Sequence, residues 1–203
     1  MKALLLIDLQ NDFMPGGALA VEHADEAVVV ANAIMPFFEI VVATQDWHPP
    51  FHASFASSHP GRAPGERMEV AGALQTLWPN HCVQNSPGAS FHSALDVAGI
   101  THVVRKGTDV SIDSYSGFFD NGHIHDTGLA DYLKARGVGD VWIAGVATDY
   151  CVKFTALDAR QLGLPTTVVV DGCRGVDLQP GDVDAALAEM VSAGCQMVTS
   201  SDL

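Results

Sequence analysis

Short apolar runs alternate with segments of helical periodicity along most of the 203-residue chain. Ala3 to Ile7 is a continuous apolar run that ends at Asp8, as expected for a central parallel strand buried on both faces. The segment from Asp25 to Phe38 is predicted to be a helix, because one of its faces carries Ala27, Ala31, Ile34 and Phe38. The chain is therefore predicted to open with a buried strand and an amphipathic helix.

Further strands and helices follow in alternation. Strands are predicted over Ile40–Thr44, His102–Lys106, Val141–Val146, Thr166–Val170 and, as a short edge strand, Gln196–Thr199. Helices are predicted over Leu129–Arg136, Asp149–Leu162 and Asp182–Ala193, each of them closed by a glycine. This alternation predicts an α/β fold: a single doubly wound domain over residues 1–203, with a mainly parallel sheet and helices on both faces.

One long segment interrupts the alternation. The residues from Pro49 to about Gly99 are rich in Pro, Gly, His and Ser. A connection of this length is uncommon in a compact domain unless it has a function. We therefore expect this segment to carry part of the functional site.

Polar side chains stand where the predicted strands end. They are Asp8, Asp46 with His48, Lys106 and Asp171, and Cys151 lies in the turn that starts the next helix after Val146. Ligands of open α/β sheets bind beyond the carboxyl ends of the strands. These side chains are therefore predicted to converge on one edge of the sheet.

Cys151 is a candidate nucleophile. In the first turn of a helix, unpaired N–H groups and the positive end of the helix dipole are expected to lower the pKa of its thiol. The same N–H groups could hold a developing oxyanion. A buried structural role is the commoner one for a cysteine considered by itself, and the position of Cys151 outweighs this only together with its neighbouring groups.

Asp8 and Lys106 are the candidate partners of this thiol. Asp8 follows the most apolar strand, so burial should raise the pKa of its carboxyl group and let it accept a thiol proton. Lys106 could pair with Asp8. Taken singly, an aspartate after a strand often caps a turn, and a lysine at a strand end is often solvated.

Composition and charge limit the kinds of molecule that the protein is expected to bind. The formal net charge is −14, so nucleic acid and anionic membrane surfaces are not expected as partners. The chain contains no apolar run long enough for a membrane span, and Asp8 interrupts an N-terminal run that superficially resembles an export signal. We therefore expect a cytoplasmic enzyme with free thiols at Cys82, Cys151, Cys173 and Cys195. These cysteines contain no CxxC pair, so a cysteine-based zinc site is not expected.

A carboxylate and two imidazoles form a candidate metal site. Asp46 and His48 are two residues apart just after a predicted strand, and His81 lies across the long segment. Such a set suits one divalent transition metal, zinc foremost, with iron and manganese as alternatives. The chain has nine histidines, so surface positions are the default interpretation of any one of them.

Six motifs in order along the chain resemble one enzyme family. They are Asp8-Leu9-Gln10-Asn11-Asp12-Phe13, Gln45-Asp46-Trp47-His48-Pro49, Trp78-Pro79-Asn80-His81-Cys82, Lys106-Gly107, Asp113-Ser114-Tyr115-Ser116-Gly117-Phe118 and Ala147-Thr148-Asp149-Tyr150-Cys151-Val152. Together they resemble the nicotinamidase/pyrazinamidase branch of the isochorismatase-like hydrolases, from Met1 to about Val176.

The resemblance implies a role for each matched residue. It implies a catalytic triad of Asp8, Lys106 and Cys151 on an isochorismatase-like fold, with a cis peptide between Val146 and Ala147. The backbone N–H groups of Ala147 and Cys151 would form the oxyanion hole. The implied metal ligands are Asp46, His48 and His81, with His52 as a fourth ligand in some members, and the implied substrate pocket is lined by Phe13, Trp78 and Tyr115. Cys82, beside a ligand, is expected to be a packed thiol.

The implied activity is hydrolysis of nicotinamide, and of pyrazinamide, through a cysteine thioester. One alternative keeps the fold and changes the substrate to a carbamoyl or maleamate-type amide. Another is a nucleotide- or metal-binding module without activity, although no GxGxxG follows the first strand. A homo-oligomer is compatible with the sequence, which does not fix the oligomeric state.

Overall fold

A six-stranded sheet forms the centre of the computed structural model, which describes residues 1–70 and 72–203. The strand order is β5-β2-β1-β6-β7-β8, and all neighbouring strands pair in parallel. The bounds are β1 Lys2–Ile7, β2 Ile40–Asp46, β5 His102–Lys106, β6 Asp140–Val146, β7 Thr166–Arg174 and β8 Gln196–Val198. Parallel order requires crossovers over the faces of the sheet, and the helices supply them.

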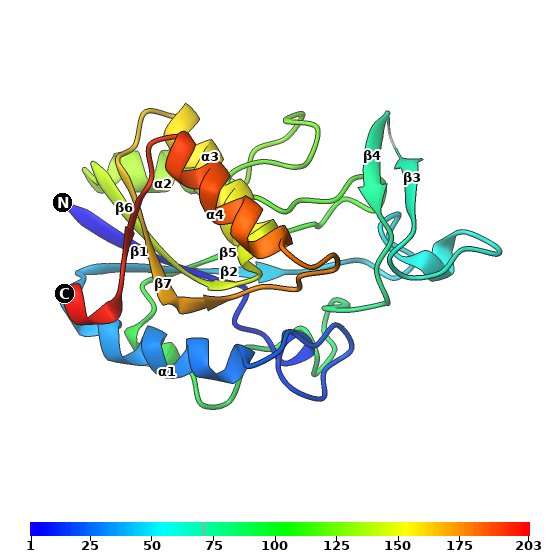
Figure 1. Ribbon diagram of the computed structural model, residues 1–203, viewed down its shortest axis with the longest axis horizontal. Helices are drawn as coiled ribbons and strands as arrows, with labels where there is room; N and C mark the ends of the chain where they lie inside the picture. The colour runs from blue at the N-terminus through cyan, green and yellow to red at the C-terminus, as the bar shows by residue number, and fades with distance from the viewer. Residues whose placement is uncertain (71) are drawn as a thin grey trace.

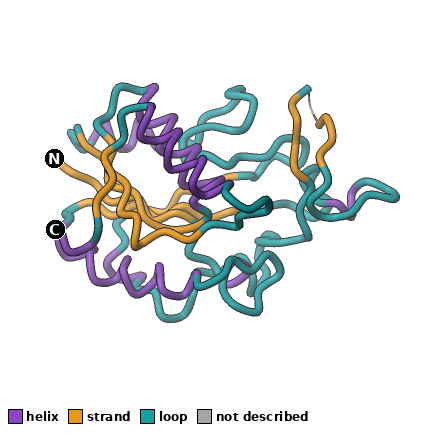
Figure 2. Tube along the Cα trace, viewed as in Figure 1, coloured by secondary structure: helices purple, strands orange, loops and turns teal. Residues whose placement is uncertain are grey.

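Helices cover both faces of the sheet (Figures 1 and 2). Along β1, Leu4 and Leu6 pack on the side of α1 (Ala24–Ile34), whereas Leu5 and Ile7 pack on the opposite side. That opposite face is covered by α2 (Leu129–Ala135), α3 (Lys153–Gln161) and α4 (Asp182–Ser192). Successive side chains of a strand point to opposite faces, so the continuous apolar run fills two cores. The predicted doubly wound α/β fold is confirmed.

Several predicted elements have different ends in the structure. The first helix was predicted to reach Phe38, but its α-helical part ends at Ile34, and a 3₁₀ turn over Met35–Phe37 follows. Pro36 explains this end, because proline lacks the N–H that would continue the α-helical pattern. The predicted strand over Thr166–Val170 continues to Arg174, past an irregularity in its register with β6.

The long segment contains a β-hairpin that the sequence analysis did not predict. β3 (Arg67–Val70) and β4 (Ala73–Thr76) pair antiparallel, and the hairpin lies apart from the main sheet in Figure 1. Further short 3₁₀ turns occur at Asn11–Phe13, Ala56–Ser58, Val97–Gly99 and Ser200–Asp202. An isolated bridge from Phe55 to Trp78 joins two parts of this segment, and a bridge from His48 to Val83 joins the segment to the residues that follow β2.

Within the described ranges all four cysteines are free and buried, in agreement with the expected thiols. None of the helices in residues 1–70 and 72–203 has the length and apolar character that a membrane crossing needs.

Candidate active site

Lys106 lies at the centre of a buried group of side chains at the carboxyl ends of the strands. Its Nζ is 2.9 Å from Asp8 Oδ2, 3.4 Å from Cys151 Sγ and 3.0 Å from the Ser114 carbonyl oxygen, and it also bonds Asp46 Oδ1. Its side chain is 0% exposed, so the alternative of a solvated lysine is wrong. The structure thus brings together the three predicted catalytic residues.

The opposite charges of Lys106 and Asp46 stabilise each other. Burial alone would lower the pKa of Lys106, but the Asp46 and Asp8 carboxylates raise it well above its ordinary value. Burial alone would raise the pKa of Asp46, but Lys106 and His48 hold it well below the usual range. The ammonium and the Asp46 carboxylate therefore both stay charged near neutral pH.

Asp8 is held by its neighbour on β2. Thr44 Oγ1 donates to Asp8 Oδ1 at 2.6 Å and accepts from the Asp8 backbone N–H at 3.1 Å. Asp8 adopts a left-handed φ of 51°, which turns the chain directly after β1. Burial raises the pKa of its carboxyl group, although Lys106 opposes this effect, so the predicted direction is confirmed. A carboxylate with a raised pKa is better suited to accept a proton.

Cys151 does not have the lowered pKa that the sequence analysis predicted. Thr148–Val152 forms a π-helical turn and α3 begins only at Lys153, while Cys151 itself is buried. Burial raises the pKa of the thiol well above its ordinary value, and Lys106 only partly offsets this. The prediction of a lowered pKa was wrong because desolvation outweighs the helix terminus. The thiol is therefore protonated at rest and depends on a base.

The base and the backbone donors lie beside this thiol. The ligand-type atoms of Asp8, Asp46 and Cys151 all lie within 4.8 Å of one another. The peptide bond between Val146 and Ala147 is cis, as the resemblance implied. Ala147 and Cys151 border the same small cavity, and Asp8 is buried behind Cys151, so the arrangement can present a nucleophile to a bound molecule with its base beside it.

The three predicted metal ligands form a second buried group that includes Asp46. Asp46 Oδ2 is 3.6 Å from His48 Nε2 and 3.8 Å from His81 Nε2. His48 Nδ1 donates to the Gly107 carbonyl at 2.9 Å and His81 Nδ1 to the Pro79 carbonyl at 2.8 Å, because carbonyl oxygens only accept. Each Nε2 is thereby left with a lone pair that faces the carboxylate.

This donor set fits a divalent metal ion. His48 Nε2 is buried and has no hydrogen-bond partner within the described residues, which a ligating role would explain. Gly107 has φ 62°, and a Cβ there would overlap the His48 ring, so glycine is needed at this position. Burial alone would lower the pKa of His48, but Asp46 raises it, so a proton competes with a metal in acid solution.

His52 and Cys82 occupy supporting positions. His52 Nδ1 accepts from the Ser54 backbone N–H at 3.2 Å, and Nε2 lies 3.3 Å from the Ile112 carbonyl. Both ring nitrogens thus have protein partners, although the ring also packs 4.3 Å from His48, centroid to centroid. This favours a supporting role over coordination. Cys82 is a buried thiol whose pKa burial raises well above the ordinary value, in keeping with packing.

The predicted pocket residues surround a small cavity beside Cys151. Phe13, Trp78 and Tyr115 line it, and so do Leu19, Tyr150 and Val176, which the sequence analysis did not select. Its volume of about 20 Å³ is roughly that of one water site. The Tyr115 hydroxyl accepts from Trp78 Nε1 at 3.1 Å and from Gln75 Nε2 at 2.7 Å. The hairpin β3–β4 therefore fixes one wall of the cavity.

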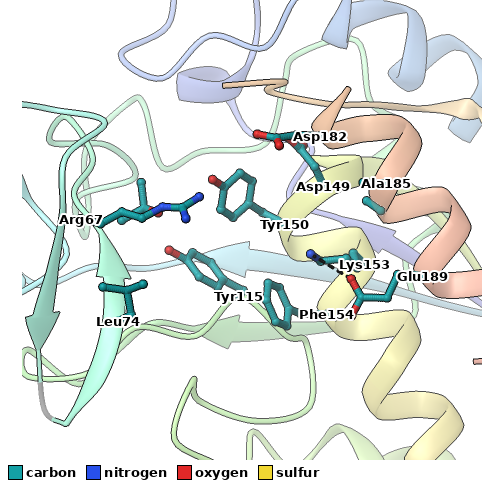
Figure 3. A pocket seen from close by; sticks show the side chains of 12 residues that line it. Arg67, Leu74, Tyr115, Asp149, Tyr150, Lys153, Phe154, Asp182, Ala185 and Glu189 are labelled. Atoms are coloured by element: carbon teal, nitrogen blue, oxygen red, sulfur yellow. Dashed lines mark ion pairs between the residues drawn. The ribbon is translucent and has the colours of Figure 1, made fainter. Parts of the chain in front are cut away.

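A larger pocket lies on the other side of two tyrosines. Figure 3 shows Tyr115 and Tyr150 between the hairpin residues Arg67 and Leu74 and the helices α3 and α4. This outer pocket has a volume of about 270 Å³. Because both tyrosines also line the small cavity, they separate it from the outer pocket.

Asp171 does not join the site, contrary to the prediction. It lies within β7, and its carboxylate accepts from the backbone N–H and the hydroxyl of Ser200 at 2.8 and 2.6 Å. It therefore anchors the C-terminal turn. Among the residues missed, Tyr150 could have been found from its place next to Cys151, whereas Thr44 and Gln75 carry no local signal of a site role.

Comparison with known proteins agrees with this geometry. An isochorismatase domain model matches residues 2–202. The chain belongs to the isochorismatase family. Its sequence is 50% identical over 205 residues to the nicotinamidase of Escherichia coli (strain K12), with 99% of this chain and 96% of that relative covered.

Solved structures of family members superpose closely. A nicotinamidase/pyrazinamidase of Acinetobacter baumannii has a TM-score of 0.96 and 44% identity, with 99% of this chain and 97% of the other covered. A Pyrococcus horikoshii pyrazinamidase, solved in complex with zinc, has a TM-score of 0.79 and 38% identity, with 98% of each chain covered. The isochorismatase-like fold of this chain is thus established along nearly its whole length.

We predict that this family member binds one divalent transition metal per chain and that His48, unlike His52, is required for it. His48→Ala removes a lone pair that faces Asp46, whereas His52→Ala removes a ring whose two nitrogens bond to protein groups. Elemental analysis of both purified variants, with circular dichroism to verify folding, measures the difference. Equal metal content in the His48→Ala variant and the unaltered protein would contradict the assignment.

Proposed function

We propose that the protein hydrolyses nicotinamide to nicotinate and ammonia, and pyrazinamide in the same way. The observation that carries the proposal is the buried contact of Lys106 with Asp8, Cys151 and Asp46, which joins a nucleophile–base pair to the candidate metal ligands. The name of the relative that is 50% identical over almost the whole chain supports the same substrate.

The first chemical step is attack by the Cys151 thiol. Asp8 accepts the thiol proton, and the resulting thiolate attacks the carboxamide carbon. Negative charge then develops on the former carbonyl oxygen. The backbone N–H groups of Ala147 and Cys151 are assigned to stabilise this oxyanion, since both residues border the cavity.

The second half of the reaction releases both products. The proton held by Asp8 passes to the leaving nitrogen, the C–N bond breaks, and ammonia departs from a thioester on Cys151. Asp8 then accepts a proton from the attacking water and passes it to the Cys151 sulfur as the C–S bond breaks, and the product acid loses its own proton to solvent and leaves as nicotinate. Each residue returns to its starting protonation state.

Lys106 stabilises the negative charge that moves between Asp8 and Cys151 during this cycle. Its ammonium is 2.9 Å from Asp8 and 3.4 Å from Cys151, so it stabilises negative charge on either group. The negative charge that Asp8 loses when it accepts the proton reappears on sulfur beside the same cation. We therefore assign Lys106 an electrostatic role and no proton transfer.

Asp46, His48 and His81 would hold a divalent metal ion, for which we favour zinc. The chemistry of the donors and the zinc complex of the Pyrococcus horikoshii relative support this choice. When bound, such an ion supplies a Lewis-acidic partner for the ring nitrogen of the substrate. The aromatic side chains of Phe13, Trp78 and Tyr115 would pack against the ring, at about 0.5–1.5 kcal/mol for a well-placed pair.

An assay of ammonia release tests the proposal directly. Nicotinamide and pyrazinamide are expected to be turned over much faster than a maleamate-type amide, a carbamoyl amide or benzamide, which lacks the ring nitrogen. Preference for the maleamate-type or carbamoyl amide would favour the alternative of another cysteine amidohydrolase. Saturable binding of NAD without ammonia release from any amide would favour a binding module.

We predict that Cys151→Ala abolishes hydrolysis and leaves the fold and nicotinamide binding largely intact. The loss in kcat should be at least about 1000-fold, because no other group can form the thioester. Cys195→Ala is the matched control, since it removes a buried thiol directly before β8, the edge strand opposite β5. Turnover of the Cys151→Ala variant within tenfold of the unaltered enzyme would refute the assignment.

We also predict that Lys106→Met impairs the chemical step more than substrate binding, with kcat lower by on the order of 100-fold. The Lys106 charge opposes the effect of burial on Asp8, so its removal raises the pKa of Asp8 further. Asp8 must be ionised to accept the thiol proton, so the acidic limb of kcat/KM should move to higher pH. Removal of the cation also disfavours the thiolate, which makes the shift a property of the pair.

The measurement is a pH series of kcat/KM for the unaltered enzyme and Lys106→Met. Lys106 also bonds Asp46, so the metal content and folding of the variant are determined in parallel. An unchanged acidic limb with near-normal kcat in metal-loaded variant would exclude the proposed role.

A further inference from the structure

The strand that carries Asp46 continues beyond its neighbour. The last pair between β1 and β2 joins Leu6 to Ala43, and β1 ends at Ile7, whereas β2 continues to Asp46. On its other side Asp46 pairs with Lys106 of β5. The edge of Asp46 that faces the end of β1 therefore needs a partner from outside the strand ladder, because buried backbone groups are costly to leave unpaired.

The Gln10 side chain supplies that partner. Its Oε1 accepts from the Asp46 backbone N–H at 2.8 Å, and its Nε2 donates to the Asp46 carbonyl at 2.8 Å. The amide thus makes the pair of bonds that a neighbouring strand would otherwise make. Nε2 also donates to the Ala89 carbonyl at 2.9 Å, and Gln10 is 0% exposed. Every one of these bonds goes to the main chain, so the amide fixes the backbone from which the Asp46 carboxylate projects.

Asp12, two residues further on, holds the turn that carries His81. Its Oδ2 accepts from the Cys82 backbone N–H at 2.7 Å, and Cys82 has a left-handed φ of 45°. The Cys82 carbonyl in turn accepts from the His48 backbone N–H at 3.0 Å. One carboxylate is thereby linked to the main chain next to both candidate imidazole ligands.

Gly88 leaves room for this carboxylate. A Cβ at Gly88 would overlap the Asp12 carboxyl group. Asp12 therefore has a closely defined place between the residue-88 backbone and the Cys82 turn. A side chain added at Gly88 would displace Asp12 without removing any of its atoms.

We propose that Gln10 and Asp12 are positioning residues for the metal ligands. Gln10 fixes the backbone position of Asp46, and Asp12 fixes the backbone beside His81 and, through the Cys82 carbonyl, that of His48. The segment from Asp8 to Asp12 then carries the catalytic base and, on alternate residues, the supports of the metal site. This inference rests on the metal site proposed above. Loss of a side chain that orients a metal ligand typically weakens metal binding 10–100-fold.

Gln45 provides a matched control for Gln10. Its Nε2 also donates to the Ala89 carbonyl, at 2.8 Å, and its Oε1 accepts from Arg105 at 3.3 Å. Both glutamines are buried, but of the two only the Gln10 side chain forms hydrogen bonds with Asp46 within the described residues. Gln10→Leu and Gln45→Leu therefore both remove an amide that donates to the Ala89 carbonyl. Of the two, Gln10→Leu alone also removes the hydrogen bonds that hold the Asp46 backbone.

The test is the zinc affinity of the full-length protein, stripped of metal and titrated against a chromophoric chelator. Gln10→Leu is expected to weaken zinc binding about 10–100-fold, and Gln45→Leu by no more than about threefold. Thermal unfolding of the metal-free forms reports any general loss of stability. Cobalt substitution gives a second readout, because a displaced Asp46 should alter the visible spectrum.

Asp12 is tested by a graded series. Asp12→Ala and Gly88→Ala should both weaken zinc binding, whereas Asp12→Asn, which keeps an oxygen for the Cys82 N–H, should restore most of it.

Zinc affinity of both Gln10→Leu and Asp12→Ala within threefold of the unaltered protein would overturn the inference, as would equal losses in Gln10→Leu and Gln45→Leu. If the unaltered protein binds no metal, the proposed metal site is wrong as well. Zinc binding that is tight and equal in every variant refutes only the positioning role.

Discussion

The ion pairs of Lys106 hold this site together. One ammonium, fully buried, lies between the carboxylates of Asp8 and Asp46 and touches the Cys151 sulfur. An isolated charge at such depth would be strongly disfavoured, so the Lys106 ammonium and the two carboxylates stabilise one another, although the two carboxylates disfavour each other's charge. With both carboxylates ionised, the three charged groups sum to one negative charge. A metal cation beside Asp46 would compensate it, which is an electrostatic reason for a metal at this position.

This arrangement makes catalysis and metal binding depend on the same strand ends. β1, β2 and β5 are adjacent and parallel, so Asp8, Asp46 and Lys106 emerge side by side. Asp46 belongs to both groups, because one oxygen bonds Lys106 and the other faces the two imidazoles. A change that moves the end of β2 would therefore alter the metal site and the catalytic group together.

The sequence was sufficient for the parts of the structure that depend on local pattern. The strands of the main sheet, their alternation with helices, and the meeting of Asp8, Lys106 and Cys151 followed from apolar runs and ordered motifs. The parts that failed depend on distant groups. Desolvation reversed the expected pKa of Cys151, and Asp171 bonds Ser200, 29 residues away in the chain. Gln10 bonds Asp46 across 36 residues, and no periodicity predicts such a contact.

Burial raises both the pKa of the Cys151 thiol and the pKa of the Asp8 carboxyl group. Both groups are buried, so each resists carrying a charge, and the thiol rests in its protonated, less oxidisable form. Transfer of the proton from sulfur to carboxylate moves a negative charge by a few ångströms without changing the net charge of the buried group. Lys106 lies close to both ends of that transfer, so its attraction is retained throughout. The nucleophile can therefore form where a thiolate alone would be unstable.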